Sequence, residues 1–119
     1  MRSYPIGEQN VTGTYARVMS SDEYRSLETS GILGSDKTNS GKTDYVSTFS
    51  ITDIYALGRT TREIRERSRT IGVAHPDVLA VFSVKDAKAV YGPRQRIGGR
   101  EVKIKAGTPA NLLDKIRCR

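Results

Sequence analysis

Cysteine, histidine and tryptophan are nearly missing from this chain of 119 residues, which has one cysteine, one histidine and no tryptophan. The single Cys118 excludes an intrachain disulfide framework and a cysteine-based zinc site. The single His75 excludes a pair of histidines that would share acid and base roles. No apolar run approaches the ~18 residues of a membrane span, and the first residues hold no apolar signal core. The sequence therefore does not predict a membrane protein.

Hydrophobic residues are also scarce, at 36% of the chain, but this share is too high and too evenly spread for a disordered protein. The length fits one domain with one compact core. Residues 1–13 contain a proline, two glycines and no periodicity. We therefore expect a lead-in or linker segment at 1–13 and a single domain at 14–119.

Basic residues outnumber acidic ones by 20 to 13, and the resulting net charge of +7 is unevenly placed. Residues 1–58 carry a net charge of −2, whereas residues 59–119 carry +9. Such a one-sided field concentrates anions, including nucleic acid, a phosphate-bearing cofactor or an acidic protein surface. A basic surface that only keeps the protein soluble explains the charge nearly as well. Charge alone does not select a partner.

Short strands dominate the predicted secondary structure. Alternation and β-branched residues predict strands at 14–19, 44–49, 77–84, 89–91, 101–105 and 112–116. Capping signals predict helices at 21–29 and directly after Ser50, and charge pairs predict a third at 60–69. A polar loop is expected at 34–43. This order of elements indicates an α+β fold with a mostly antiparallel sheet.

One of the helix signals is a capping box formed by Ser20 and Glu23. In such a box the serine hydroxyl accepts from the backbone N–H of the glutamate, and the glutamate side chain reaches back to the serine backbone. Gly31 is a suitable residue to end the same helix.

Three predicted strands carry polar residues that core packing does not require. Arg17 lies inside the first strand, where its charge needs an anion or solvent, and simple exposure is the plainer explanation. Ser47 and Thr48 precede a predicted helix N-terminus that favours phosphate, and helix capping explains only the later Ser50. Glu101 follows two glycines at a strand start, where it either faces a cleft or lies on the surface after a tight turn.

Arginine on an early strand, Ser-Thr on a middle strand and glutamate on a late strand form an order that resembles the toxin-type mono-ADP-ribosyltransferases of the R-S-E class. The likeness is best at 15–20 (YARVMS), 45–49 (YVSTF) and 98–102 (GGREV), and it extends over most of 14–116. The chain is similar in particular to the small C-terminal toxin domains of polymorphic, Rhs-type bacterial toxins. The resemblance implies a compact split antiparallel β-sheet core with two or three short helices and an NAD cleft between the sheets.

The resemblance also implies catalytic roles for three residues. Arg17 would bind the diphosphate of NAD or its nicotinamide-side ribose. Ser47 would hold the carboxylate of Glu101. That carboxylate would bind the ribose 2′-OH and stabilise the oxocarbenium-like state as nicotinamide leaves. No metal is required.

Further cofactor contacts follow from the same resemblance. Thr48 would help to shape the nicotinamide-ribose site, and Tyr45 or Phe49 would either stack on nicotinamide or belong to the core. Two positions depart from the family pattern: Phe49 stands where the third residue of the family's Ser-Thr-Ser is serine, and Gly99 stands where many members carry an acceptor-assisting Glu or Gln. The second departure leaves the acceptor open.

The implied function is that of an antibacterial toxin that transfers ADP-ribose from NAD to an elongation factor or ribosomal RNA and releases nicotinamide. As part of a secreted toxin it would act in the cytoplasm of the target cell. A cognate immunity protein, acidic where it meets the basic half of the chain, would be its partner. We expect a monomer.

A different chemical class remains open. Metal-independent ribonuclease toxins of the barnase/EndoU/colicin/RelE type, which cleave tRNA or rRNA, are also small basic α+β domains. Such a site would draw on His75, Arg17, Lys103, Tyr91 and Thr48, with a basic side chain activating the 2′-OH. A non-catalytic RNA- or protein-binding module is disfavoured because the chain has neither an aromatic stacking pattern nor a zinc or helix-turn-helix signature.

Overall fold

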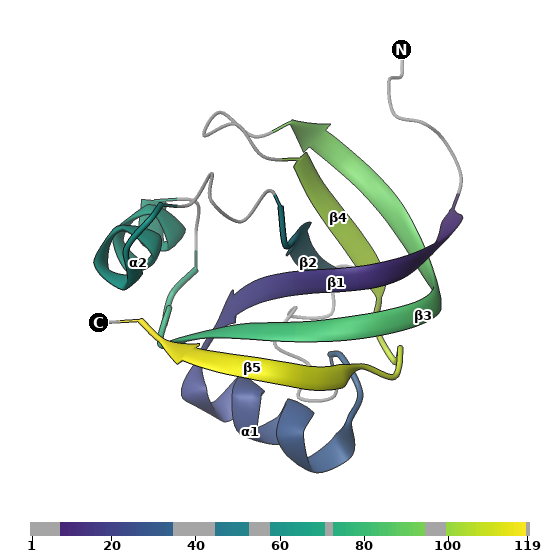
Figure 1. Ribbon diagram of the computed structural model, residues 1–119, viewed down its shortest axis with the longest axis horizontal. Coiled ribbons are helices and arrows are strands. Elements are labelled where there is room, and N and C mark those ends of the chain that lie inside the picture. Colours follow the sequence, from purple (N-terminus) through teal and green to yellow (C-terminus); the bar gives the residue numbers. More distant parts are fainter. Residues whose placement is uncertain (1–7, 35–44, 53–57, 71–72, 95–99, 119) are drawn as a thin grey trace.

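The computed structural model describes residues 8–34, 45–52, 58–70, 73–94 and 100–118 (Figure 1). In these ranges the helices are α1 (Ser21–Ser30) and α2 (Thr61–Thr70). The strands are β1 (Gln9–Met19), β2 (Tyr45–Ser50), β3 (Val78–Arg94), β4 (Arg100–Lys105) and β5 (Asn111–Arg117). The predicted α+β class, with a compact antiparallel sheet and short helices, is confirmed.

The five strands form one strongly bent antiparallel sheet in the order β1-β2-β4-β3-β5, and β1 also pairs with β3. The extra pairing closes β1, β2, β4 and β3 into a ring, with β5 added outside it. The long β3 makes this possible, because its first half pairs with β5 and its second half with β4. Figure 1 shows β3 running beside β5 and then curving up to β4.

The expectation of two strands at 77–84 and 89–91 is wrong, because the chain bends there without leaving the sheet. The pairing of β1 with β3 shifts between Val11 and Gly13, and opposite this shift Asp86 has a φ of 50°. The backbone N–H of Asp86 donates to the Thr12 hydroxyl over 2.9 Å. An extra residue in one strand bends the ladder locally, so the short strand predicted at 89–91 is part of the curved second half of β3.

The first strand also begins earlier than expected. Residues 9–13, assigned to the lead-in segment, belong to β1, and Val11 is buried in the core. The other predicted strands are present with ends shifted by one or two residues. The polar loop beyond residue 34 and the helix expected after Ser50 lie almost wholly outside the described residues.

Both described helices match their sequence signals. Helix α1 starts at the N-cap Ser20, whose hydroxyl accepts from the N–H of Glu23, and ends at Gly31 in the left-handed conformation. Helix α2 is charged on its outer side, with Arg62 and Glu66 paired at 3.5 Å. It nevertheless buries Ile64 against the sheet. No helix in the described ranges is long and apolar enough to cross a membrane.

Two hydrophobic clusters occupy the two faces of the sheet. The larger contains Tyr15, Met19 and Phe82, and includes Tyr24 and Leu27 of α1. The smaller is formed by side chains of the opposite parity and by α2, and consists of Ala16, Val18, Phe49, Ile64, Leu79 and Cys118. Because side chains alternate along a strand, Arg17 has the parity of the α1 face, whereas Ser47 has that of the α2 face.

Candidate active site

Arg17 is held by two elements at once. Its Nε and Nη2 groups donate to the two carboxylate oxygens of Glu23 over 2.6 and 3.1 Å, and its Nη1 group donates to the backbone carbonyl of Ser47 over 2.9 Å. Its side chain is only 15% exposed and that of Glu23 only 7%. Arg17 is therefore not a residue of the outer surface. The anion that its strand position requires is supplied by α1.

Glu23 has a role that the capping signal did not predict. The first half of the capping box is present, since Ser20 accepts from the Glu23 backbone. The Glu23 carboxylate, however, pairs with Arg17 instead of reaching back to the helix start. A fork-to-fork pair fixes the plane of a guanidinium as well as its position. Glu23 is thus a positioning residue for Arg17.

Ser47 connects Arg17 to Glu101. In the register of β2 and β4, Ser47 pairs with Lys103 and Phe49 pairs with Glu101. Ser47 and Glu101 therefore lie diagonally opposite each other on one face, within reach of side-chain contact. The Ser47 hydroxyl donates to the Glu101 carboxylate while the Ser47 carbonyl accepts from Arg17. Three strands thus link the three predicted catalytic residues through Ser47, whose backbone carbonyl accepts from Arg17 on the α1 face and whose hydroxyl donates to Glu101 on the α2 face.

Gly92 gives the Glu101 side chain its space. A Cβ atom at Gly92 would lie 3.0 Å from Oε1 of Glu101 and 3.3 Å from its Cβ. The glycine is buried on β3, next to the β4 backbone that carries the carboxylate. The sequence pointed instead to the glycines at 98 and 99, which lie outside the described residues. Gly92 and Glu23 are the two site residues that sequence reasoning missed.

Thr48 does not face a ligand site. Its side chain is completely buried, and its hydroxyl donates to the carbonyl of Val102 over 2.7 Å. The role predicted for it at the nicotinamide ribose is therefore corrected. Because side chains alternate along a strand, Thr48 points into the core enclosed by the four strands while Ser47 faces Glu101. Phe49 belongs to the smaller core cluster. Tyr45 is half-buried and its hydroxyl donates to Glu8, which lowers the pKa of that carboxyl.

Of the residues of the ribonuclease alternative, His75 lies apart, whereas Arg17, Thr48, Lys103 and Tyr91 lie around the pairing of β4 with β2 and β3. His75 is exposed and precedes β3, whereas Tyr91 and Lys103 lie where the other half of β3 pairs with β4. Thr48 is enclosed in the core. The structure therefore links Arg17, Ser47 and Glu101 by hydrogen bonds, and of the ribonuclease residues it separates only His75 from this region.

Comparisons with protein-family models, with curated proteins and with solved structures give no match. The resemblance to R-S-E transferases thus remains a prediction from the sequence motifs.

Proposed function

We propose that this protein is an NAD-dependent mono-ADP-ribosyltransferase that modifies a component of the translation machinery. The observation that supports the proposal most strongly is the bonded set of Arg17, Ser47 and Glu101, drawn from three strands far apart in sequence. The residues of a motif recognised in a sequence need not lie close together in the folded protein. The hydroxyl bond from Ser47 to Glu101 gives a physical reason for serine at that position, whereas the bond from Arg17 ends on a backbone carbonyl that any residue would supply.

Arg17 is suited to bind the NAD diphosphate. A guanidinium carries five N–H groups, and its bonds to Glu23 and Ser47 use three of them. The remaining two, on the η nitrogens, can donate to phosphate oxygens in a charge-assisted contact. Because Glu23 and Ser47 already fix the guanidinium plane, little side-chain freedom would be lost when NAD binds.

Glu101 is suited to the bond-breaking step. Its carboxylate is half-buried and oriented by the Ser47 hydroxyl. In the proposed reaction the bond between ribose C1′ and the nicotinamide nitrogen breaks, and nicotinamide leaves with the electron pair. The carboxylate stabilises the cationic ribose while binding its 2′-OH. An acceptor nucleophile then forms the new bond to C1′ and loses its proton.

The biological setting belongs to the same proposal and rests on the resemblance. The protein would be the toxic part of a secreted antibacterial effector that acts in the cytoplasm of the target cell, as a monomer. An immunity protein with an acidic surface would block it. The acceptor would be an elongation factor or ribosomal RNA.

The test is incubation of the purified protein with NAD labelled on its adenylate part and a bacterial lysate. We expect label in a macromolecule, with nuclease and protease treatment showing whether the acceptor is RNA or protein. Glu101→Gln should remove the label, whereas Glu66→Gln, an equal charge change on the exposed side of α2, should not. Cleavage of RNA by the wild-type protein without NAD, together with no transfer of label, would overturn the proposal.

A further inference from the structure

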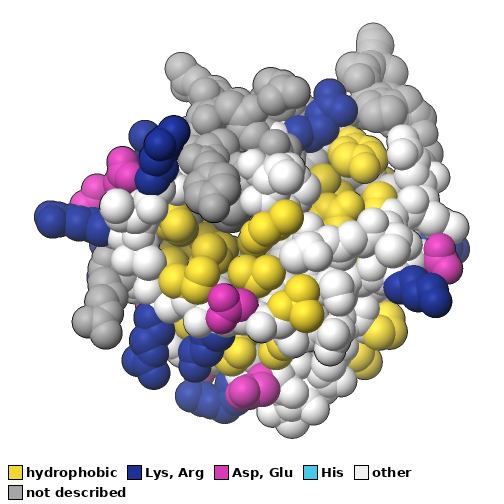
Figure 2. Space-filling view, viewed as in Figure 1, with side chains coloured by type: hydrophobic (Ala, Val, Ile, Leu, Met, Phe, Trp, Pro, Cys, Tyr) yellow, Lys and Arg dark blue, Asp and Glu magenta, His cyan; other side chains and the backbone are white. Residues whose placement is uncertain are grey.

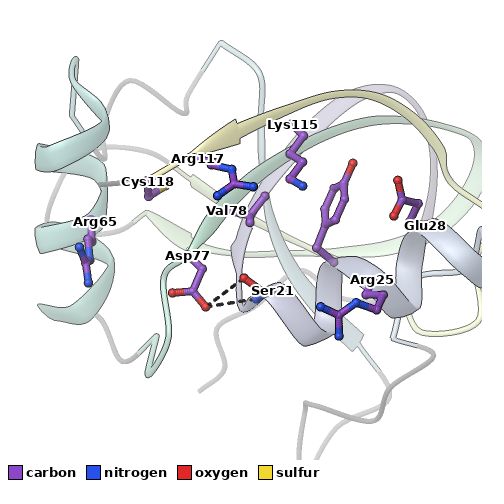
Figure 3. Close-up of a pocket in the computed structure, with 10 residues that line it drawn as sticks. Ser21, Arg25, Glu28, Arg65, Asp77, Val78, Lys115, Arg117 and Cys118 are labelled. Carbon is purple, nitrogen blue, oxygen red and sulfur yellow. Dashed lines mark hydrogen bonds between the residues drawn. The ribbon is translucent and has the colours of Figure 1, made fainter.

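A groove of about 420 Å³ lies beside α1, and none of Arg17, Ser47 and Glu101 lines it. Its charged lining residues come from α1, α2, the segment before β3, and β5: Arg25, Glu28, Arg65, Asp77, Lys115 and Arg117. In Figure 3, Lys115 and Arg117 extend from β5 on one side, Arg25 and Glu28 lie on α1 on the other, and Arg65 lies on α2 at one end. In the space-filling view of Figure 2, Lys and Arg side chains gather at the lower left of the molecule.

Part of this charge is already used within the protein. Asp77 accepts from the backbone N–H and hydroxyl of Ser21 over 3.2 and 3.5 Å, which ties it to the start of α1. Arg25 pairs with Asp22 at 3.2 Å. Arg25 is therefore the lining cation that has a carboxylate partner, and the Glu28 and Asp77 carboxylates remain in the lining.

The other three cations have no carboxylate partner in the described part of the chain. Lys115 lies over the ring of Tyr24, with its Nζ 4.8 Å from the ring centroid, and Arg117 is exposed. The Nε of Arg65 is buried, and no described group accepts its hydrogen. A buried donor without an acceptor is costly, but a ligand in the groove does not reach a buried atom, so this Nε does not by itself identify a ligand.

The spacing of two of these cations indicates what that ligand is. Lys115 pairs with Ala80 and Arg117 with Val78, so both side chains have the parity of the α1 face. Residues two apart on a strand are separated by about 6.7 Å. This spacing is close to that of successive phosphates along an extended nucleic-acid strand.

We infer that this groove binds the phosphodiester backbone of a single nucleic-acid strand, with Lys115 and Arg117 contacting successive phosphates and Arg65 donating to the strand at the end of the groove. The inference goes beyond the proposed transferase function and does not depend on it. Cys118 lies at the edge of the groove, where burial raises the pKa of its thiol despite the nearby Arg65.

The test measures binding of a labelled single-stranded RNA of about 12 nucleotides by fluorescence anisotropy, as a function of salt concentration. The Lys115→Gln/Arg117→Gln variant should bind about tenfold more weakly, and its salt slope should fall by about 1.4, because each phosphate contact on a single strand contributes about 0.7. The matched control is Lys85→Gln/Lys88→Gln, which also removes two exposed positive charges, but from β3 outside the groove. It should keep both the affinity and the slope.

Three further measurements keep the inference falsifiable. Arg117→Gln alone removes an exposed side chain, so it should lower the affinity even if the double variant fails to fold, and Arg117→Lys should restore it. Inorganic phosphate should compete only at concentrations far above those of the RNA, because it engages one cation at a time. Equal losses in the groove and control variants, or competition by poly-glutamate as strong as that by RNA of equal charge, would overturn the inference.

Discussion

The Arg17 cluster, formed by Arg17, Glu23, Ser47 and Glu101, lies close to the groove beside α1. The two regions differ in whether their positively charged side chains have partners within the protein. Arg17, Ala80 and Lys115 stand in one row across β1, β3 and β5, so the two regions are about 10 Å apart by strand spacing. In the cluster the guanidinium is matched by Glu23 and Ser47. In the groove three cations lack such partners among the described residues.

This difference indicates what the positive charge of residues 59–119 does. A paired charge holds a geometry, whereas an unpaired one attracts a ligand. Arg65, Lys115 and Arg117 all come from residues 59–119, while Arg17, Glu23 and Ser47 come from the slightly acidic first half. Three of these positive charges therefore lie in the groove, whereas Arg100, Lys103 and Lys105 lie on β4 beside Glu101.

The largest expected effect is that of a Glu101 variant on nicotinamide release, and it tests whether the Arg17 cluster and the groove are separate sites. Glu101→Gln should slow nicotinamide release from NAD by about 10²- to 10³-fold, because the variant loses the charge that opposes the developing cation. Lys115→Gln/Arg117→Gln should change the same rate by no more than about twofold. Chromatographic detection of free nicotinamide measures both. If the groove variant loses as much activity as Glu101→Gln, the two regions form one site.

The second prediction breaks the pairing itself. Glu23→Gln should lower the free energy of unfolding by about 2 kcal/mol, because it removes a charged partner from a largely buried guanidinium. Urea unfolding measures the loss, and Arg25→Gln, which breaks only the exposed pair with Asp22, should cost less than about 1 kcal/mol. If Glu23 positions Arg17, the KM for NAD should also rise more than kcat falls. A loss of stability with an unchanged KM would leave Glu23 a purely structural residue.

The third prediction concerns the space beside Glu101. Gly92→Ala introduces a Cβ only 3.0 Å from Oε1, so the carboxylate must shift by a few tenths of an ångström. Nicotinamide release should fall by about tenfold, since small displacements of reacting groups are costly. Gly107→Ala is the comparison, because an added Cβ would have open space there, although its φ of 93° makes that variant strained. Its effect should appear in stability and not in the rate.

The smallest effect is expected at Thr48. Thr48→Val keeps the shape and removes the bond to the Val102 carbonyl, which should cost about 1 kcal/mol of stability. Nicotinamide release should remain within about twofold of wild type. A loss of activity as large as that of Glu101→Gln would return Thr48 to the ribose site.

Local signals were sufficient for most of the fold. Ser20 and Gly31 delimit α1 as their capping signals predicted, and the strand predicted at 101–105 is present, with Val102 and Ile104 buried. The continuity of β3 was not predictable, because Asp86 and Thr12, whose contact holds the bend, are 74 residues apart. In the sequence, a bulge within one strand and a turn between two strands leave similar local patterns of residues.

The sequence was sufficient to predict which residues form the candidate site, but not which residues they contact. The order of Arg17, Ser47 and Glu101 was visible in the sequence, and so was the alternation that turns Thr48 away from Ser47. Glu23 was assigned to helix capping because a local partner was available, while its actual partner on β1 depends on how α1 packs. Gly92 lies beside Glu101 only through the pairing of β3 with β4.

The most direct test of the central claim incubates the purified protein in two separate reactions, one with NAD alone and one with cellular RNA alone. If Arg17, Ser47 and Glu101 form an NAD site, nicotinamide and ADP-ribose should accumulate in the first reaction, where water replaces the acceptor, and the RNA should stay intact in the second. Intact NAD together with cleaved RNA would contradict the account and favour the ribonuclease class.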